Sequence, residues 1–328
     1  MKQPAPKRHV LWAVDPNEED TKLQLKVFKT LSRIVPQRSA VIEPVTVTLP
    51  AVKVPNAAFA AFLVHQKNTT EKLLKKWIRK LDDRRLLSPT FLTNDRLTTG
   101  ALVQELLDYA RMVKPDFIAV GTHGRRGLQR FFIGSFAETL LLRSEIPVVL
   151  VNPTTNATKP IEHIFFASDF SPASREAFEK VVGLASALKA KVTLYSKIEY
   201  FVPQTSELMK VSHYQDFLEN DRQSRKKKGE KWCAWAQQAG VETTLFLDEQ
   251  IAFVAEGILS VAKKTKADLV AMASSSGFWA TTLVGSVVRK VVRLSPFPVW
   301  VIHPASSAKS LHKKEPMTSH RPRALTLF

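Results

Sequence analysis

The chain has 328 residues, of which 45% are hydrophobic, and this length suggests about two domains with apolar cores. Its 48 Lys and Arg residues exceed its 30 Asp and Glu residues, and the formal net charge of +18 attracts polyanions or anionic surfaces without specifying either. The single cysteine, Cys233, excludes a disulfide framework and a cysteine-rich zinc site. No apolar run suggests a membrane span or a secretory signal, so we expect a cytoplasmic protein.

Strands and helices alternate through the first half of the sequence. An apolar run at 10–14 ends at Asp15 and predicts a strand, and the next apolar residues have helical spacing: Leu23, Val27, Leu31 and Ile34. A second strand runs from Ala40 toward Val47, and we expect Pro44 and Pro50 to make its end irregular. The later predicted elements are a helix at 57–80, a strand near 90–92, a helix at 99–113, a strand at 116–120, a helix at 136–144 and a strand at 147–151. This alternation predicts βαβ units and a parallel sheet.

The same order of elements begins again after residue 160. A strand that ends at Asp169 corresponds to the strand that ends at Asp15, and the run from Lys266 to Met272 corresponds to the run from Lys114 to Val120. A repeat of about 150 residues indicates a duplicated domain. We therefore predict one domain at 1–152, a linker at 153–160, a second domain at 161–304 and a basic flexible tail at 305–328.

A glycine pattern follows the predicted strand that ends at Val120. It reads G-x2-G-x9-G-S and places Gly121, Gly124, Gly134 and Ser135 between that strand and the next helix. Open α/β sheets bind ligands at the carboxyl ends of their strands. Glycines there allow close approach of the backbone, and free amides at a helix N-terminus favour phosphate. The pattern predicts a phosphate site; the alternative is a tight turn whose glycines only relieve backbone strain.

This pattern, with its flanking strands and helix, resembles the nucleotide-binding signature of the universal stress protein family. The resemblance implies an α/β fold of two tandem Rossmann-like domains, each with a five-stranded parallel sheet flanked by helices. Separate domains of that family often pair between chains through the last strand, and a tandem chain would supply this pairing internally. We expect two similar halves that pack against each other, not one continuous ten-stranded sheet, and homodimerisation stays open.

The resemblance also implies that the first half binds ATP or another adenine nucleotide. Asp15 and the neighbouring Ala13 would contact the ribose or adenine, Val45 would contact adenine, and Asp15 could hold Mg²⁺ through phosphate oxygens. Arg125 and Arg126 either add charge-assisted phosphate contacts or stay solvated. The nucleotide-binding residues that we expect are Ala13, Asp15, Val45, Val120, Gly121, Gly124, Arg125, Gly134, Ser135 and Phe136.

The second copy lacks most of the glycine pattern. Ala273 stands opposite Gly121, Ser276 stands opposite Gly124, and only the Gly285–Ser286 pair remains. A Cβ atom at the first two positions should block the approach of phosphates, so we expect a degenerate site that serves packing or regulation. Asp169 keeps weak or altered ligand binding open.

We expect a nucleotide-binding regulatory protein of the stress response that acts on an unidentified protein partner. The P-loop lysine and the kinase motifs are absent, so an efficient ATPase is not expected. One alternative is slow ATP hydrolysis or nucleotide transfer with His123 as general base. The other is binding of nucleic acid or an anionic surface through Arg222, residues 225–228 and the tail, although no recognised nucleic-acid module accompanies them. Cys233 should be a buried thiol rather than a nucleophile.

Overall fold

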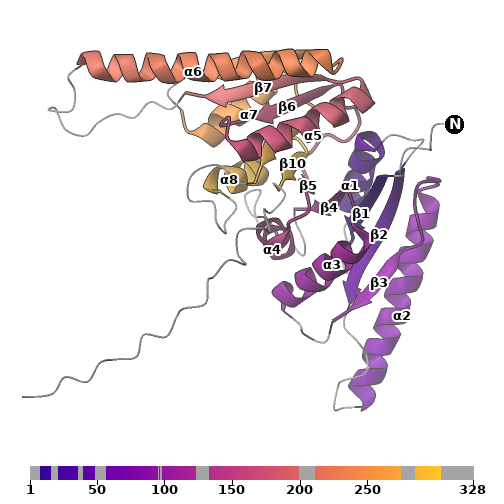
Figure 1. The fold of residues 1–328 in the computed structure, drawn as a ribbon. Helices are drawn as coiled ribbons and strands as arrows, with labels where there is room; N and C mark the ends of the chain where they lie inside the picture. The colour runs from indigo at the N-terminus through magenta and orange to yellow at the C-terminus, as the bar shows by residue number, and fades with distance from the viewer. Residues whose placement is uncertain are drawn as a thin grey trace, which may run out of the picture.

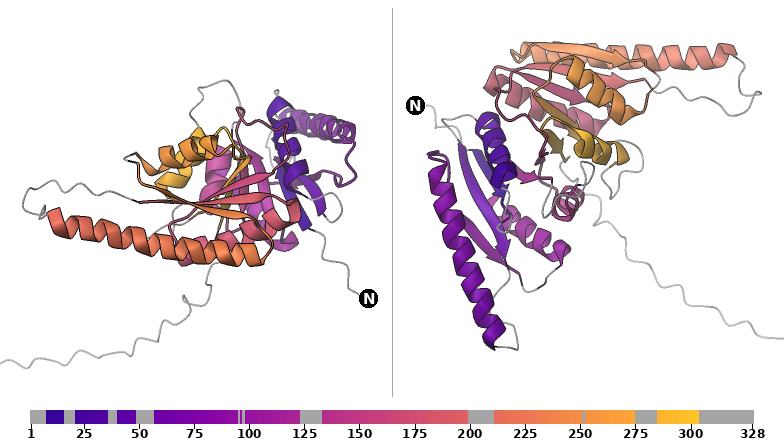
Figure 2. Two further views of the ribbon diagram at one scale, coloured as in Figure 1. Left: turned by 90° about the horizontal axis from the view of Figure 1, so that it is seen from above. Right: turned by 180° about the vertical axis from the view of Figure 1, so that it is seen from behind.

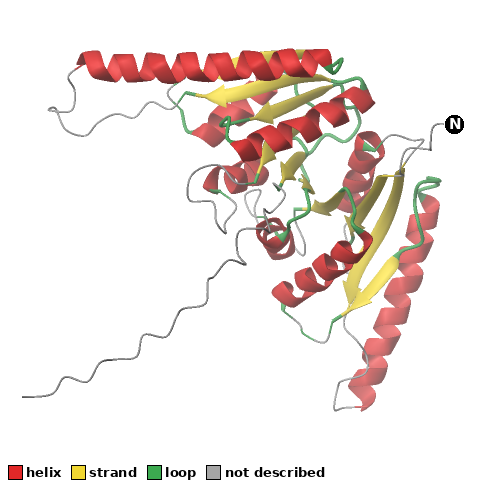
Figure 3. Ribbon diagram, viewed as in Figure 1, coloured by secondary structure: helices red, strands yellow, loops and turns green. Residues whose placement is uncertain are grey.

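The computed structural model describes residues 8–15, 21–35, 40–48, 57–94, 96, 98–122, 133–198, 211–250, 252–274 and 285–303. Strands and helices alternate in both halves of the described chain (Figures 1 and 3). The first half contains β1 Arg8–Ala13, α1 Thr21–Ile34, β2 Ala40–Thr48, α2 Ala57–Lys80, β3 Thr90–Thr93, α3 Thr99–Val113, β4 Phe117–Gly121, α4 Ser135–Arg143 and β5 Val148–Val151. The second half contains β6 His163–Ala167, α5 Pro172–Leu188, β7 Lys191–Lys197, α6 Val211–Gln238, β8 Thr243–Asp248, α7 Val254–Lys264, β9 Leu269–Ala273, α8 Ser286–Leu294 and β10 Val299–Ile302. The predicted tail lies outside the described residues.

All ten strands belong to one sheet, in the order β3-β2-β1-β4-β5-β10-β9-β6-β7-β8. Each half contributes five parallel strands in corresponding order, which confirms the predicted fold class. The halves meet where β5 and β10 pair antiparallel, with Val149 opposite Trp300. Our expectation that the sheet would not be continuous was therefore wrong. The last strand of each half would otherwise be an edge with unpaired backbone groups, and their mutual pairing removes both edges.

Pro44 does not interrupt β2, contrary to our expectation. The strand continues to Thr48, and Pro44 lies opposite Trp12 of β1. The backbone amide of Ile42 donates to the carbonyl oxygen of Arg85, on the side of β2 away from β1. Backbone amides two residues apart in a strand point the same way, so the amide nitrogen of Pro44 also points away from β1. Pairing with β3 begins only at Val45. Pro44 therefore lies where its missing N–H group breaks no strand ladder.

The helices cover the two faces of the sheet in alternating pairs. Alternate residues of β1 show this division, because Trp12 belongs to one buried apolar cluster and Leu11 to the other. The cluster around Trp12 contains side chains from α1, α2, α5 and α6, and the cluster around Leu11 contains side chains from α3, α4, α7 and α8. The sheet twists so strongly that α2 and α6 run in quite different directions (Figures 1 and 2). None of the described helices is long and apolar enough to cross a membrane.

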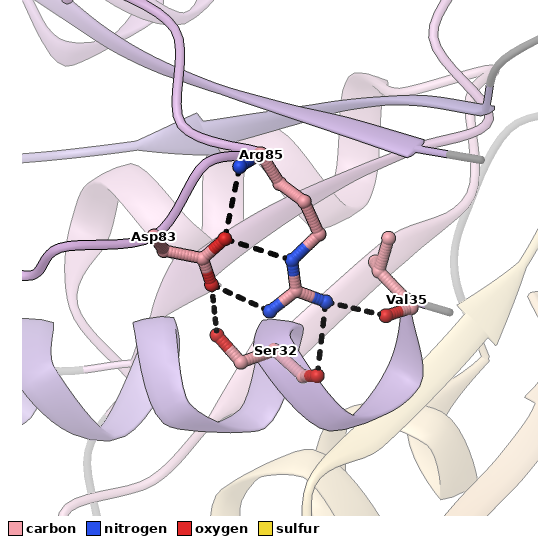
Figure 4. A network of polar contacts seen from close by, with 4 residues as sticks. All are labelled: Ser32, Val35, Asp83 and Arg85. Carbon is pink, nitrogen blue, oxygen red and sulfur yellow. Dashed lines mark hydrogen bonds and ion pairs between the residues drawn. The ribbon is translucent and has the colours of Figure 1, made fainter. Parts of the chain in front are cut away.

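The buried guanidinium group of Arg85 closes the C-terminal end of α1 (Figure 4). Its Nη1 donates to the carbonyl oxygens of Ser32 and Val35, at 3.1 and 2.6 Å. Asp83 accepts from Nε and Nη2 of Arg85 at 2.9 and 2.5 Å, and these hydrogen bonds lower the pKa of Asp83. Arg85 thus satisfies carbonyl groups that the helix end leaves without a partner, and it places positive charge at the negative end of the helix dipole.

The segment that we predicted as a linker is packed against the first half. Thr155 and Ala157 are buried, and the hydroxyl group of Thr155 accepts from the backbone amide of Asn152 at 3.1 Å. From α1, Lys26 donates to the carbonyl oxygen of Pro153, and Arg33 donates to that of Lys159 at 2.5 Å. Backbone groups of this segment therefore contribute to the packing of α1.

Candidate functional site

Three predicted site residues form one row across the sheet of the first half. Ala13 lies opposite Val45 of β2 on one side and opposite Val120 of β4 on the other. All three side chains are buried in the same apolar cluster, and Phe136 of α4 packs against it. The row lies at the carboxyl ends of β2, β1 and β4, where an open α/β sheet binds its ligand. The structure therefore brings Ala13, Val45, Val120 and Phe136 together.

Gly121 ends β4 at a place where α1 comes very close. A Cβ atom on Gly121 would lie 2.8 Å from Cδ2 of Leu23 and 3.0 Å from its Cγ, which is closer than side-chain carbons pack. A side chain at position 121 would therefore force Leu23 of α1 to shift. The sequence pattern had suggested only close approach of a ligand or turn strain, and Leu23 was known only as a residue of the apolar helix face.

The two ends of the signature loop are held together by the backbone. The amide of Thr122 donates to the carbonyl oxygen of Val151 at 3.0 Å, and the carbonyl oxygen of Thr122 accepts from the amide of Gly134. Gly134 precedes α4 and has no side chain to cap it, so the first amides of α4 point out of the helix beside the end of β4. Glu138 in the first turn partly offsets the positive end of the helix dipole. Unpaired amides at the start of a helix are groups that can bind an anion.

The middle of the predicted loop lies outside the described residues. Gly124, Arg125, Arg126 and His123 all lie outside the described residues. Asp15 is described, is half-buried and lies two residues after the end of β1. The described site is therefore the apolar row, Asp15, and the two loop ends.

Sequence reasoning missed Asn152, which lies just after β5. Its side-chain oxygen accepts from the hydroxyl group of Thr122, and its Nδ2 donates to the carbonyl oxygens of Val292 and Ser295 at 2.8 and 2.6 Å. Asn152 thus joins the start of the signature loop to the C-terminal end of α8 in the second half. No local pattern in the sequence marks this residue, because its partners in the second half are 140 and 143 residues away.

Comparison with known proteins follows the same division into halves. The profile of the universal stress protein family matches residues 7–152 and again 160–303. The chain belongs to the universal stress protein family. A universal stress protein of Methanocaldococcus jannaschii is 36% identical over 52 residues, which cover 16% of this chain and 31% of that protein.

Solved structures of two-domain length have the same fold. A universal stress protein from Archaeoglobus fulgidus superposes with a TM-score of 0.61 at 16% identity, over 90% of this chain and 98% of that chain. A functionally unknown protein from Pseudomonas aeruginosa superposes with a TM-score of 0.57 at 14% identity, over 91% and 93% of the two chains. At these identities the similarity establishes the tandem universal stress protein fold and nothing about ligands.

The second universal stress protein domain contains a cavity of about 230 Å³ at the equivalent edge of its sheet. Residues from the ends of β6, β7 and β9 and from α7 line it, together with Arg225 of α6. Ala273 ends β9 as Gly121 ends β4, and it is one of the residues that line this cavity. The oxygen Oδ1 of Asp169 accepts from the amide of Ser171 and the hydroxyl group of Ser174, at 3.0 and 2.6 Å, so part of this carboxylate is used by the start of α5.

A buried charged cluster borders this second cavity. Oδ2 of Asp248 accepts from the hydroxyl group of Tyr195 at 2.7 Å and from Nζ of Lys197 at 3.0 Å. Burial and the nearby carboxylate raise the pKa of Tyr195 well above its usual value. Burial alone would raise the pKa of Asp248, but hydrogen bonds from Tyr195, Gln250 and Lys197 outweigh it and lower that pKa. Because Lys197 is neutralised by Asp248, the cavity differs from a site built to hold several phosphates.

The position of α7 against this cluster depends on a glycine. A Cβ atom on Gly257 would lie 2.6 Å from Oδ2 of Asp248 and 2.7 Å from the hydroxyl oxygen of Tyr195. The cluster and the helix therefore fit together only without a side chain at position 257. The paired charges of the second domain are thus part of its packing, and no sequence pattern indicates that these residues are paired.

Proposed function

We propose that the first domain binds ATP or a related adenine nucleotide and that the protein acts as a nucleotide-binding regulator. The observation that carries this proposal is the hydrogen bond that joins the two ends of the signature loop. The amide of Gly134 donates to the carbonyl oxygen of Thr122, beside the first amides of α4, which no side chain caps. These amides, which we propose bind phosphate, lie next to the apolar row of Ala13, Val45 and Val120. Family membership supports the same assignment, because the glycine pattern resembles the family's nucleotide-binding signature.

The residues present fit such a ligand. The buried row of Ala13, Val45 and Val120 fixes the strand ends beside which a base would lie. Asp15 lies where a ribose hydroxyl could be bound, and the first turn of α4 would receive phosphate oxygens. Among the described residues, no group of three or more His, Cys, Asp or Glu side chains could hold a metal ion. If Mg²⁺ accompanies the nucleotide, phosphate oxygens would supply most of its ligands, with Asp15 as a protein contact.

A pair of matched substitutions tests the choice of domain. Ser135 and Ser286 are exposed first residues of α4 and α8, and each follows an uncapped glycine. Ser135→Glu adds negative charge where phosphate is proposed to bind, whereas a carboxylate at this position is favourable for the helix itself. We expect Ser135→Glu to weaken ATP binding in calorimetry by about tenfold or more, which corresponds to at least about 1.4 kcal/mol.

The control variant, Ser286→Glu, should leave ATP affinity within about twofold, because its charge lies in the second domain. Adenosine, which lacks phosphate, should lose much less affinity than ATP in the Ser135→Glu variant. Loss of ATP binding in Ser286→Glu alone would place the nucleotide in the second domain. Absence of ATP binding by the unmodified protein, with no nucleotide in mass spectra of the denatured preparation, would refute the proposal.

A further inference from the structure

The exposed face of α2 carries a stripe of positive charge. Lys72, Lys75, Lys76, Arg79 and Lys80 are all exposed and recur at the spacing of one helix face. The opposite face is apolar: Leu74 and Ile78 are buried, and Trp77 packs against the core with its ring 5.5 Å from that of Trp12. The helix is thus fixed to the sheet by one face and presents the basic stripe with the other.

The stripe lies on the outside of the molecule. Figure 1 shows α2 at the outer side of the first domain, beside the edge strand β3. Nζ of Lys75 lies 5.2 Å from the centre of the Phe91 ring of β3, which places the stripe next to this edge. From Lys72 to Lys80 the helix rises about 12 Å. Duplex DNA carries about seven charges over that length, so several phosphates come within reach of the stripe.

The charges of the stripe are less compensated by carboxylates than those of the two arginines of the α6 run, Arg222 and Arg225. Among the described residues, the carboxylate that pairs with a member of the stripe is Glu71, 3.6 Å from Lys75. On α6, Arg222 pairs with Glu219 and with Glu249, and Arg225 pairs with Asp221 at 2.8 Å. The sequence had drawn attention to the run on α6, but the structure shows its arginines already engaged by carboxylates.

We propose that the α2 stripe, defined as Lys72, Lys75, Lys76, Arg79 and Lys80, is a docking surface for the phosphate backbone of duplex nucleic acid. The surplus of positive charge in the whole chain, +18, favours a polyanion. A helix that binds a membrane surface must insert an apolar face, and the apolar face of α2 is buried under the sheet. The large apolar residues that α2 exposes among the described side chains, Val64 and Leu73, are about 13 Å apart along the axis and form no continuous patch.

Contacts to phosphates would be independent of base sequence and strongly dependent on salt. The positions of Arg79 and Lys80 in the last turn are also favourable for the helix dipole. Lys72 and Lys76 lie one or more turns before the end, where this effect has decayed, so their placement is not explained by the helix alone. The surface is separate from the row around Ala13 and requires no nucleotide.

A pair of triple variants of the full chain tests the proposal. Lys72→Gln/Lys76→Gln/Lys80→Gln removes three charges from the stripe, and Lys226→Gln/Lys227→Gln/Lys228→Gln removes three exposed charges from α6. Both variants have the same net charge, so a difference between them reports local contacts and not the overall field. Binding of a fluorescein-labelled 30-base-pair duplex is measured by anisotropy at several salt concentrations. The log–log salt slope of the α2 variant should fall by about 2 to 3, and that of the α6 variant by less than about 1.

ATP affinity and the unfolding midpoint are measured for the same variants, and both should match those of the unmodified protein. Equal losses of duplex binding in the two triple variants would show that binding depends on the net charge of the protein and not on the α2 stripe, and this would overturn the proposal. A larger loss in the α6 variant would overturn it as well. The proposal is also overturned if the unmodified protein fails to bind duplex at 50 mM salt, or binds phosphatidylserine vesicles instead. Failure of ATP binding alone would leave the docking surface supported.

Discussion

The hydroxyl group of Thr122 donates a hydrogen bond to the side-chain oxygen of Asn152, and both residues are buried where β4 and β5 end. Asn152 also binds the end of α8 in the second domain. His303 follows β10 as Asn152 follows β5, and its Nε2 lies 3.2 Å from the carbonyl oxygen of Leu141 in α4. Each domain therefore contributes a polar side chain to the last helix of the other, on either side of the β5–β10 junction.

We predict that Asn152→Ala lowers the free energy of unfolding by about 2–4 kcal/mol. The substitution removes the hydrogen-bond partner of three buried groups: the carbonyl oxygens of Val292 and Ser295 and the hydroxyl group of Thr122. Each buried group left without a partner costs about 1–3 kcal/mol before the structure relaxes. Urea denaturation measures the change. The control is Asn156→Ala, an exposed asparagine of the same segment, and equal effects of the two substitutions would contradict the prediction.

We predict that Gly121→Ala destabilises the first domain through Leu23 even without any ligand. The new methyl group would meet Leu23 at 2.8 Å, and overpacking of this kind costs about 1–3 kcal/mol. In a double-mutant cycle, Leu23→Ala should relieve part of the cost, so the double variant should be more stable than the sum of the single effects.

A second glycine provides the control for this cycle. A Cβ atom on Gly183 of α5 would meet nothing within 4 Å. Gly183→Ala should therefore keep or raise stability by up to about 1 kcal/mol, because alanine is the better helix former. An additive cycle between Gly121 and Leu23 would show that the close approach in the structure has no energetic consequence.

We predict that breaking the buried ion pair of the second domain is costly. Asp248→Asn should lower stability by about 3–5 kcal/mol, because it leaves the ammonium group of Lys197 buried without a compensating charge. The neighbouring exposed carboxylate gives the control: Glu249→Gln, which only loses a surface pair with Arg222, should cost less than about 1 kcal/mol.

The effect of Asp248 should also depend on acid pH. Its pKa is lowered in the folded protein, so its contribution is complete above the unfolded pKa, about 3.9, and is lost as pH falls through the folded pKa. The stability difference between the unmodified protein and Asp248→Asn, followed by urea denaturation, should therefore shrink only below about pH 4. A difference that vanishes already near pH 6 would disagree with this assignment.

We predict that His303 makes the protein less stable as pH falls from about 6.5 to 4. Burial lowers the pKa of His303 to about 4, so in this range the unfolded chain binds the extra proton. The shift from about 6.5 corresponds to about 3 kcal/mol of lost stability at the acid end. His303→Asn, which copies the residue found at the corresponding place after β5, should flatten the pH dependence. His163, whose pKa burial also lowers, remains in both proteins and contributes equally to both curves.

The positions of most helices and strands could be predicted from local patterns. The predicted helices at 57–80 and 99–113 coincide with α2 and α3. Cys233 is buried as expected, and burial raises the pKa of its thiol to about 11, so it is a poor nucleophile at neutral pH. Pro44 was misjudged because its effect depends on what lies beside β2 at that residue, which no window of the sequence contains.

The sequence located the candidate site at the ends of the strands, but it did not predict the residues that pack against the site. The glycine pattern and the end of the first strand located Ala13, Gly121, Gly134 and Asp15 at one edge of the sheet. Leu23, whose contact explains why position 121 has no side chain, comes from another element about a hundred residues earlier. Gly124 and Arg125 stay predictions, as does the bound nucleotide.

The sequence by itself determined the two domains, their alternating elements and the family, because periodicity, glycine conformation and internal repetition are local properties of the chain. Only the tertiary structure decided how the domains join and which charges are available. The pairing of β5 with β10 depends on two edges that meet in space, and the same is true of Asn152 at the end of α8. The arginines of α6 are matched by carboxylates that include Glu249 beyond β8, whereas the α2 stripe keeps its charge toward solvent. Charge and edge pairing act over distances in space, and folding sets those distances independently of separation along the chain.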